Sequence, residues 1–131
     1  MKIVVAMDSF KGSLKSCEAC EIVAGAIREC SVEADITVLP MADGGEGTAE
    51  AMLRAGSGRW IERKVTGPLP EMDVDAGFAW FERAEEAVVE MATASGLELL
   101  GAEQMNPLKT TTYGTGELIE AAVESGAQQV L

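Results

Sequence analysis

Short apolar runs that alternate with helical patterns constrain the first 58 residues more than any other feature. Residues 2–6 (KIVVA) and 36–39 (ITVL) are β-branched runs of the kind that forms buried parallel strands. A polar loop and then a helical pattern follow each run. In the first helix, apolar side chains recur at helical spacing from Cys20 to Ile27, and residues 48–55 form the second. This order predicts an α/β fold, Rossmann-like or flavodoxin-like, with a mostly parallel sheet.

The middle of the chain has a different pattern. Residues 59–66 predict a strand, and the turn 67–70 separates it from residues 72–80, where every second residue is apolar. The run 87–91 is again short and apolar. We therefore expect residues 59–92 to form an antiparallel or mixed patch attached to the parallel sheet of residues 1–58.

Residues 93–131 begin with a long polar connection, 93–117, which holds one short helical turn near Leu97. Connections of this length without regular structure are uncommon and often functional. A helix is expected at 116–125 and the start of a strand at 128–131. Because a parallel strand cut short leaves much of its ladder unpaired, we expect the chain to be the N-terminal portion of a longer one. The exposed edge of this shortened strand would promote self-association of the chain.

Charge excludes two classes of partner. The chain of 131 residues has the length of one domain, and its 10 Lys and Arg against 22 Asp and Glu give a net charge of −12. Nucleic acids and anionic membranes require a basic face, so neither is an expected partner. The N-terminal apolar run is too short for a signal peptide, and no run is long enough to span a bilayer. A cytoplasmic location is therefore expected.

The residue types restrict the chemistry further. There is no histidine, so acid–base chemistry falls to Asp, Glu or Lys, and a metal would be an oxygen-ligated one such as Mg²⁺. Cys17 and Cys20 form a C-x-x-C that suits a redox pair. The alternative is that Cys20 belongs to the apolar helix face while Cys17 caps the first turn. Cys30 leaves the cysteine count odd, unlike a secreted disulfide framework.

Two glycine-rich segments precede expected helices and have a similar composition. A helix N-terminus carries partial positive charge, and glycines let an anion approach its amides closely. Ordinary N-cap turns explain the same residues about as well. Neither segment matches the Walker or dinucleotide-binding pattern. The two segments are Asp43-Gly44-Gly45-Glu46-Gly47-Thr48 and Thr112-Tyr113-Gly114-Thr115-Gly116-Glu117.

Carboxylates favour a functional interpretation of the first segment. Asp43 would repel a bare anion, but it suits a site where it holds Mg²⁺ or accepts a proton from a hydroxyl group. Asp8 follows the first strand as Asp43 follows the second, and ligands of open α/β sheets bind at that edge. Lys11 could supply positive charge beside Asp8. The alternative is that Asp8 is an ordinary turn residue without a functional role.

Five blocks of sequence resemble the bacterial glycerate kinase family, in order and nearly from end to end of the chain. They are M-D-S-F-K-G-S-L (7–14), A-D-G-G-E-G-T (42–48), V-T-G-P-L (65–69), V-E-M-A-T-A-S-G-L-E-L (89–99) and N-P-L-K-T-T-T-Y-G-T-G-E-L-I (106–119). Family members are considerably longer, so the resemblance implies an N-terminal portion. Met7 stands where proline is usual, and a later glycine-rich block, G-G-S-A-T-N-D-G-G, is absent after Leu131.

The resemblance implies a two-domain α/β fold and ATP-dependent phosphorylation of D-glycerate with Mg²⁺. Phosphoryl transfer needs positioning and charge neutralisation more than covalent help. Asp8, Lys11 and Asp43 are the expected catalytic residues, and Asp43 and Glu46 the expected metal ligands. The two helix N-termini would receive carboxylate or phosphate oxygens. The expected substrate-binding residues are Gly44, Gly45, Glu46, Thr48, Thr112, Gly114, Gly116 and Glu117.

A non-catalytic domain that binds small anions or serves as an interaction module remains the alternative, with the glycines kept for turns. Under the kinase hypothesis, D-glycerate and a nucleotide are the partners. The residues do not decide which of the two glycine segments meets which of these molecules.

Overall fold

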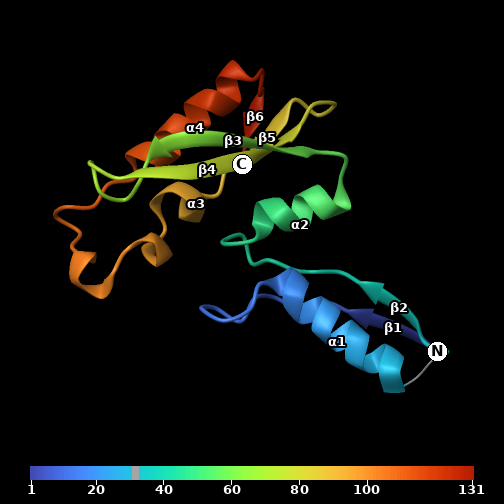
Figure 1. Cartoon of the computed structure of the whole chain (residues 1–131). Coiled ribbons are helices and arrows are strands. Elements are labelled where there is room, and N and C mark those ends of the chain that lie inside the picture. Colours follow the sequence, from blue (N-terminus) through green and yellow to red (C-terminus); the bar gives the residue numbers. More distant parts are fainter. Residues whose placement is uncertain (31–32) are drawn as a thin grey trace. The chain divides into compact units, whose positions relative to one another are not determined.

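The N-terminal unit, Met1–Ala51, consists largely of a βαβ motif (Figure 1). The structure is a computed structural model that describes residues 1–30 and 33–131. Strand β1 (Lys2–Val5) pairs in parallel with β2 (Asp35–Val38), with Ile3 opposite Ile36. Helix α1 (Ser16–Cys30) connects them. The predicted parallel strand–helix–strand order is therefore confirmed for this part of the chain.

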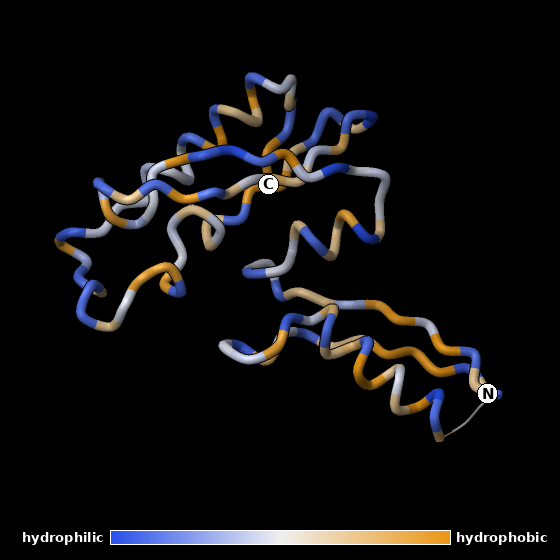
Figure 2. Tube along the Cα trace, viewed as in Figure 1, coloured by the Kyte–Doolittle hydropathy of each residue, from blue (hydrophilic) through white to orange (hydrophobic). Residues whose placement is uncertain are grey.

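Helix α1 packs against the two strands through the apolar stripe that the sequence predicts. Val5, Cys20 and Ala24 are buried at the centre, and Val23 and Ile27 pack against them. Figure 2 shows apolar colour along β1 and β2 and intermittently along α1, in keeping with this packing. The helix has 15 residues, and its polar positions, such as Glu18 and Arg28, lie at the surface.

The C-terminal unit, Met52–Leu131, is built on a sheet with the strand order β3-β4-β5-β6. Its strands are β3 (Arg59–Thr66), β4 (Asp73–Phe81), β5 (Glu86–Val88) and β6 (Gln129–Val130). Strand β4 pairs antiparallel with both β3 and β5, and β6 pairs with β5 in parallel. The predicted mixed patch is thus present.

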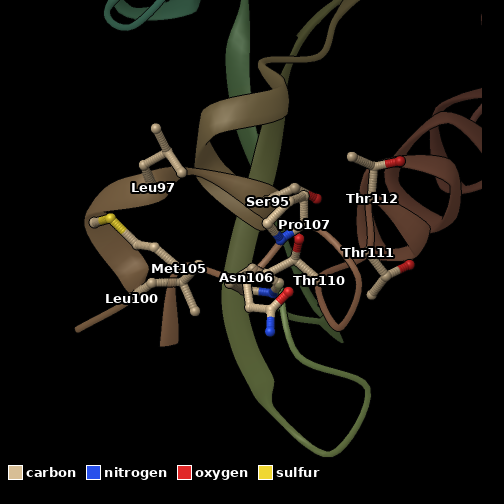
Figure 3. A pocket seen from close by; sticks show the side chains of 10 residues that line it. Ser95, Leu97, Leu100, Met105, Asn106, Pro107, Thr110, Thr111 and Thr112 are labelled. Carbon is tan, nitrogen blue, oxygen red and sulfur yellow. The ribbon is translucent and has the colours of Figure 1, made fainter. Parts of the chain in front are cut away.

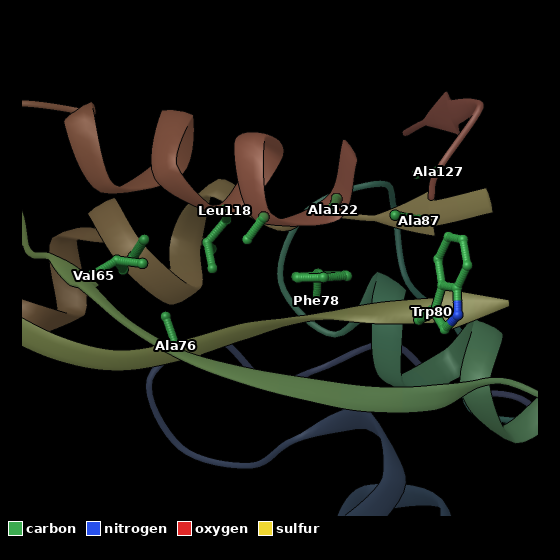
Figure 4. Close-up of a cluster of buried hydrophobic side chains, with 10 residues drawn as sticks. Val65, Ala76, Phe78, Trp80, Ala87, Leu118, Ala122 and Ala127 are labelled. Atoms are coloured by element: carbon green, nitrogen blue, oxygen red, sulfur yellow. The ribbon is translucent and has the colours of Figure 1, made fainter. Parts of the chain in front are cut away.

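Helix α4 (Tyr113–Glu124) lies along one face of this sheet and closes the larger core (Figure 4). Phe78 of β4 and Leu118 of α4 are fully buried there, and Trp80 is nearly so. Ala94 of helix α3 (Met91–Ser95) belongs to the same cluster. Full burial of a side chain such as Phe78 contributes about 1.5–3 kcal/mol, so this core is the main stabilising element of the C-terminal unit.

Four expectations about organisation differ from the structure. The patch is not attached to the parallel sheet, because β1–β2 and β3–β6 are separate sheets. The chain divides into two compact units rather than the one domain expected from its length. The run 87–91 is strand only to Val88, and α3 begins at Met91. The connection 93–117 contains α3, the 3₁₀ turns η1 (Leu97–Leu99) and η2 (Ala102–Gln104), and the start of α4.

Helix α2 (Thr48–Ala55) has the bounds that the sequence predicts, and the boundary between the two units falls within it. Gly126, with a φ of +100°, follows the end of α4, in the left-handed conformation that glycine adopts most readily. No helix in the described part of the chain is both long enough and apolar enough to cross a bilayer.

Candidate functional site

Lys11 and Asp43 come together in the N-terminal unit. Both follow the carboxyl ends of the parallel strands β1 and β2, which lie at the same edge of the small sheet. The Lys11 Nζ lies 3.6 Å from Asp43 Oδ2, and both side chains are well exposed. Exposed pairs of this kind contribute little to stability. Their position at the strand ends matters more, because it places one cation and one anion side by side where ligands of α/β sheets bind.

Asp43 also folds back on its own loop. The Gly45 N–H donates to Asp43 Oδ1 over 3.2 Å. This hydrogen bond, followed by the charge of Lys11, lowers the pKa of Asp43 below its ordinary value of 3.8. A carboxylate with a lowered pKa is a weak proton acceptor. Of its two expected roles, holding a cation therefore suits Asp43 better than accepting a proton from a hydroxyl group.

Asp8 and Lys11 lie on a tight loop between β1 and α1. The Ser9 N–H donates to Asp8 Oδ1 over 2.6 Å, and the loop closes through two bonds between the backbones of Phe10 and Leu14. Gly12 at its tip has a φ of +79°. The loop therefore holds Lys11 at a turn whose backbone is fixed by local bonds, and Asp8, on the same loop, is exposed.

The geometry of the turn accounts for part of the composition of segment 43–48. Gly44 and Gly47 have φ values of +96° and +86°, which side-chain-bearing residues rarely adopt. The Thr48 hydroxyl donates to the Gly45 carbonyl over 2.7 Å and so closes the turn that starts α2. Two glycines and the threonine thus shape the turn itself. Glu46 is exposed.

A metal would find two carboxylates in this segment, Asp43 and Glu46. The described residues contain no group of three or more Asp, Glu, Cys or His side chains that could enclose a metal ion. Mg²⁺ is commonly bound by one or two carboxylates together with water and substrate phosphates, so this donor set fits Mg²⁺ and not a closed metal site.

In the C-terminal unit, the second glycine segment lies in the first turns of α4 rather than before a helix. Helix α4 starts at Tyr113, three residues earlier than expected. Gly114 is buried, and a Cβ there would collide with the backbone carbonyl of Thr66. Gly116 faces open space. Close backbone packing accounts for Gly114, whereas nothing in the packing requires a glycine at 116.

Glu117 makes a specific contact with the end of β3. Its Oε2 accepts a hydrogen bond from the Thr66 N–H over 2.7 Å, across a separation of 51 residues. The Thr111 N–H donates to the Pro68 carbonyl over 2.9 Å, and the Ser95 and Thr115 hydroxyls lie 2.8 Å apart. Together these bonds fix residues 111–117 against β3, the following turn and α3.

A cavity of about 510 Å³ opens beside this fixed segment (Figure 3). Thr112, which precedes α4, is the one residue of the expected site in its lining. The other lining residues were not singled out from the sequence, although most fall inside the quoted blocks 65–69, 89–99 and 106–119. The lining consists of Pro68, Ser95, Leu97, Leu100, Met105, Asn106, Pro107, Thr110, Thr111 and Thr112.

The two cysteines of the C-x-x-C lie inside helix α1. Cys17 and Cys20 are both buried there, and the Cys20 thiol lies 3.8 Å from the Met7 carbonyl. Cys30 is exposed. The packing of Cys20 beside Val5 and Ala24 agrees with the apolar-face alternative.

Comparison with known proteins identifies the family. The model of the glycerate kinase family matches residues 3–131. The chain belongs to the glycerate kinase family. It is 49% identical to the glycerate kinase of Bacillus subtilis strain 168 over 131 residues, which are 100% of this chain and 34% of that protein. It is 47% identical to glycerate 2-kinase of Escherichia coli K12, again over 100% of this chain and 34% of that protein.

A solved structure agrees with this assignment. The crystal structure of a glycerate kinase 2 from Salmonella typhimurium LT2 superposes with a TM-score of 0.74 at 47% identity, covering 99% of this chain and 35% of the other. The resemblance and the mixed α/β fold inferred from the sequence are confirmed. The chain spans about a third of the length of these family members, as expected for an N-terminal portion.

Proposed function

We propose that this glycerate kinase family chain forms part of an enzyme that transfers the γ-phosphoryl group of ATP to a hydroxyl group of D-glycerate. The observation that carries the proposal is family membership over residues 3–131, with 49% identity to a glycerate kinase. The Lys11–Asp43 pair at the carboxyl edge of β1 and β2 supports it, because phosphoryl transfer depends on fixed charges around the phosphates.

In this proposal Lys11 neutralises phosphate oxygens. Its ammonium group lies at the tip of a closed loop and is mostly exposed, so it can turn from Asp43 toward a ligand without unpacking. A lysine serves such sites as a compact point charge. This matters in a chain with a net charge of −12, where the general field repels an anionic substrate.

Asp43 and Glu46 are proposed to hold Mg²⁺, which when bound neutralises the charge of the phosphate oxygens. The Gly45 N–H and the charge of Lys11 lower the pKa of Asp43, which favours the ionised form that a cation requires. Asp8, at the end of β1, is proposed as a further ligand or as the base that accepts the proton of the attacking hydroxyl. Gly44, Gly45 and Thr48 would orient the loop around these charges.

Thr112 and Gly116 are proposed to contact substrate from the start of α4, where Thr112 is exposed and Gly116 leaves open space. Gly114 and Glu117 are already engaged with Thr66, so their contribution to substrate binding would be through the backbone that they fix. The remaining elements of the proposal are a cytoplasmic location and self-association of this chain when it is expressed alone.

A coupled assay that follows ADP release tests the proposal on the full-length protein that carries this chain. We expect release to require D-glycerate and Mg²⁺ together, and chelation of Mg²⁺ to abolish it. Binding of D-glycerate by calorimetry without any turnover would instead support the non-catalytic anion-binding alternative.

A further inference from the structure

The cavity of the C-terminal unit can be compared with the two proposed substrates, ATP and D-glycerate, by its size and its lining. Its volume of about 510 Å³ falls within the roughly 300–1,000 Å³ usual for small-molecule sites. D-glycerate, a three-carbon acid, would fill only a small part of it. A purine nucleoside is large enough to occupy such a space.

The lining is uncharged. None of its ten residues, all in the described part of the chain, carries a charged side chain. A carboxylate such as that of glycerate would lose its hydration there without gaining a cation. The other unit, by contrast, offers a cation for an anionic group in Lys11, which pairs with Asp43.

The lining also divides into two chemical kinds, which suits a flat base joined to a sugar. Leu97, Leu100 and Met105 supply apolar surface, as Figure 3 shows, and Leu97 is 68% exposed. Ser95, Asn106 and residues 110–112 supply hydroxyl and amide groups on the same cavity. Apolar walls with a few oriented polar groups are typical of cofactor sites.

We infer that this cavity binds the nucleoside portion of ATP, with the base against the apolar residues and the ribose toward the hydroxyl-bearing segment 110–112. The inference rests on the proposed kinase function and assigns one of its two substrates to a site. The bonds that Thr111 makes to Pro68 and Glu117 makes to Thr66 keep the polar wall in place before the nucleotide arrives.

Photolabelling of the full-length protein with 8-azido-ATP tests the location. We expect the label on peptides from residues 95–112, with protection by ATP and none by D-glycerate. Label elsewhere, or equal protection by D-glycerate, would overturn the inference.

A matched pair of variants tests the energetics. Leu97 lines the cavity, whereas Leu108 is 93% exposed and does not. Leu97→Glu should raise the KM for ATP about tenfold, because the variant loses apolar contact with the base and adds a negative charge that repels the phosphates. The KM for D-glycerate should stay within twofold, and Leu108→Glu should change neither constant.

Inhibition by adenosine separates the two causes. Adenosine carries no phosphate, so a weaker inhibition in Leu97→Glu shows loss of nucleoside contact rather than phosphate repulsion, and unchanged inhibition would contradict the inference. A Leu97→Glu effect on D-glycerate alone would overturn the inference and leave the kinase function intact. Labelling of 95–112 in a protein that does not phosphorylate D-glycerate would support the inference and refute the proposed function.

Discussion

At the scale of single residues, two glycines of α4 that are two positions apart have opposite surroundings. Gly114 is buried against the Thr66 carbonyl, and Gly116 faces open space. Gly114→Ala should lower the free energy of unfolding by about 1–3 kcal/mol, because the added methyl group forces the backbone of α4 away from that of Thr66. Gly116→Ala should leave it unchanged or raise it by up to about 1 kcal/mol, since alanine favours the helix. Urea unfolding measures both.

Gly116→Ala also reports on function. If the added methyl group lowers turnover while stability holds, the open side of Gly116 is where a substrate approaches, as proposed. If turnover also holds, Gly116 has no part in the site.

Asp43 allows a second test at this scale. Asp43→Asn in the full-length protein keeps the shape but removes the charge, so turnover should fall about 10²-fold, as for loss of one electrostatic contact to a transition state. Asp75→Asn, at an exposed position of β4, is the matched control and should leave turnover unchanged. Near-normal turnover of the Asp43 variant would exclude its proposed role.

The pH dependence follows from the direction of the pKa shift. The pKa of Asp43 is lower in the folded protein than its ordinary value of 3.8. The stability that this gives is present above that value and is lost as the pH falls through the folded pKa. Asp43 therefore should contribute no titration to the activity profile between about pH 5 and 9, which a comparison of wild type and Asp43→Asn would show.

The position of a residue in the fold was predictable from the sequence where it depends only on the direction of the strands. Asp8 and Asp43 each follow a strand, and parallel strands end at one edge, so their placement at that edge follows from the alternation of strands and helices. The contacts of Gly114 and Glu117 with Thr66 were not predictable, because they join segments 48 and 51 residues apart. No local pattern encodes such a meeting.

At the scale of elements, the attachment of α4 to β3 depends on the Glu117 carboxylate. Glu117→Ala leaves the Thr66 N–H without its acceptor and should cost about 1–3 kcal/mol of unfolding free energy. Glu117→Gln retains an acceptor oxygen and should recover most of that loss. Thermal unfolding of the two variants measures the difference, and equal losses would show that charge rather than the hydrogen bond matters.

Element boundaries were predictable where local propensity and packing agree. The bounds of α2 and β3 match expectation, because each has a clear pattern and a turn residue at its end. The start of α4 did not match the expected position, because residues 112–117 include two glycines and two threonines, which are poor helix formers. Contact with β3 overrides that preference. Helix α3 has five residues, too few to form alone, and gains its stability from packing Ala94 into the core.

At the scale of the whole molecule, the two units differ in the size of their cores. Among the described residues, the buried cluster of the N-terminal unit consists of Val5, Cys20 and Ala24 beside a two-stranded sheet, whereas that of the C-terminal unit has ten residues beside four strands. We expect amides of β1 and β2 to exchange with solvent at least roughly tenfold faster than those at the centre of β4. Hydrogen exchange read by mass spectrometry checks this, and equal protection would contradict it.

The separation into two units was the feature of the whole molecule that the sequence concealed. Strand patterns show which residues alternate, but not which strands pair, since pairing depends on distant partners. Residues 59–92 therefore could be assigned as strands without any sign that they form their own sheet. The cavity was hidden for the same reason, because its lining combines Pro68 with residues 95–112.

The position of the tryptophans determines what optical experiments on this chain will see. Both, Trp60 and Trp80, belong to the C-terminal unit, and Trp80 lies in its core. Tryptophan fluorescence therefore reports on the C-terminal unit only, while far-ultraviolet circular dichroism reports on both units. A melting curve that looks simple by fluorescence can thus conceal an earlier loss of α1, and superposition of the two signals is the proof that the chain melts as one.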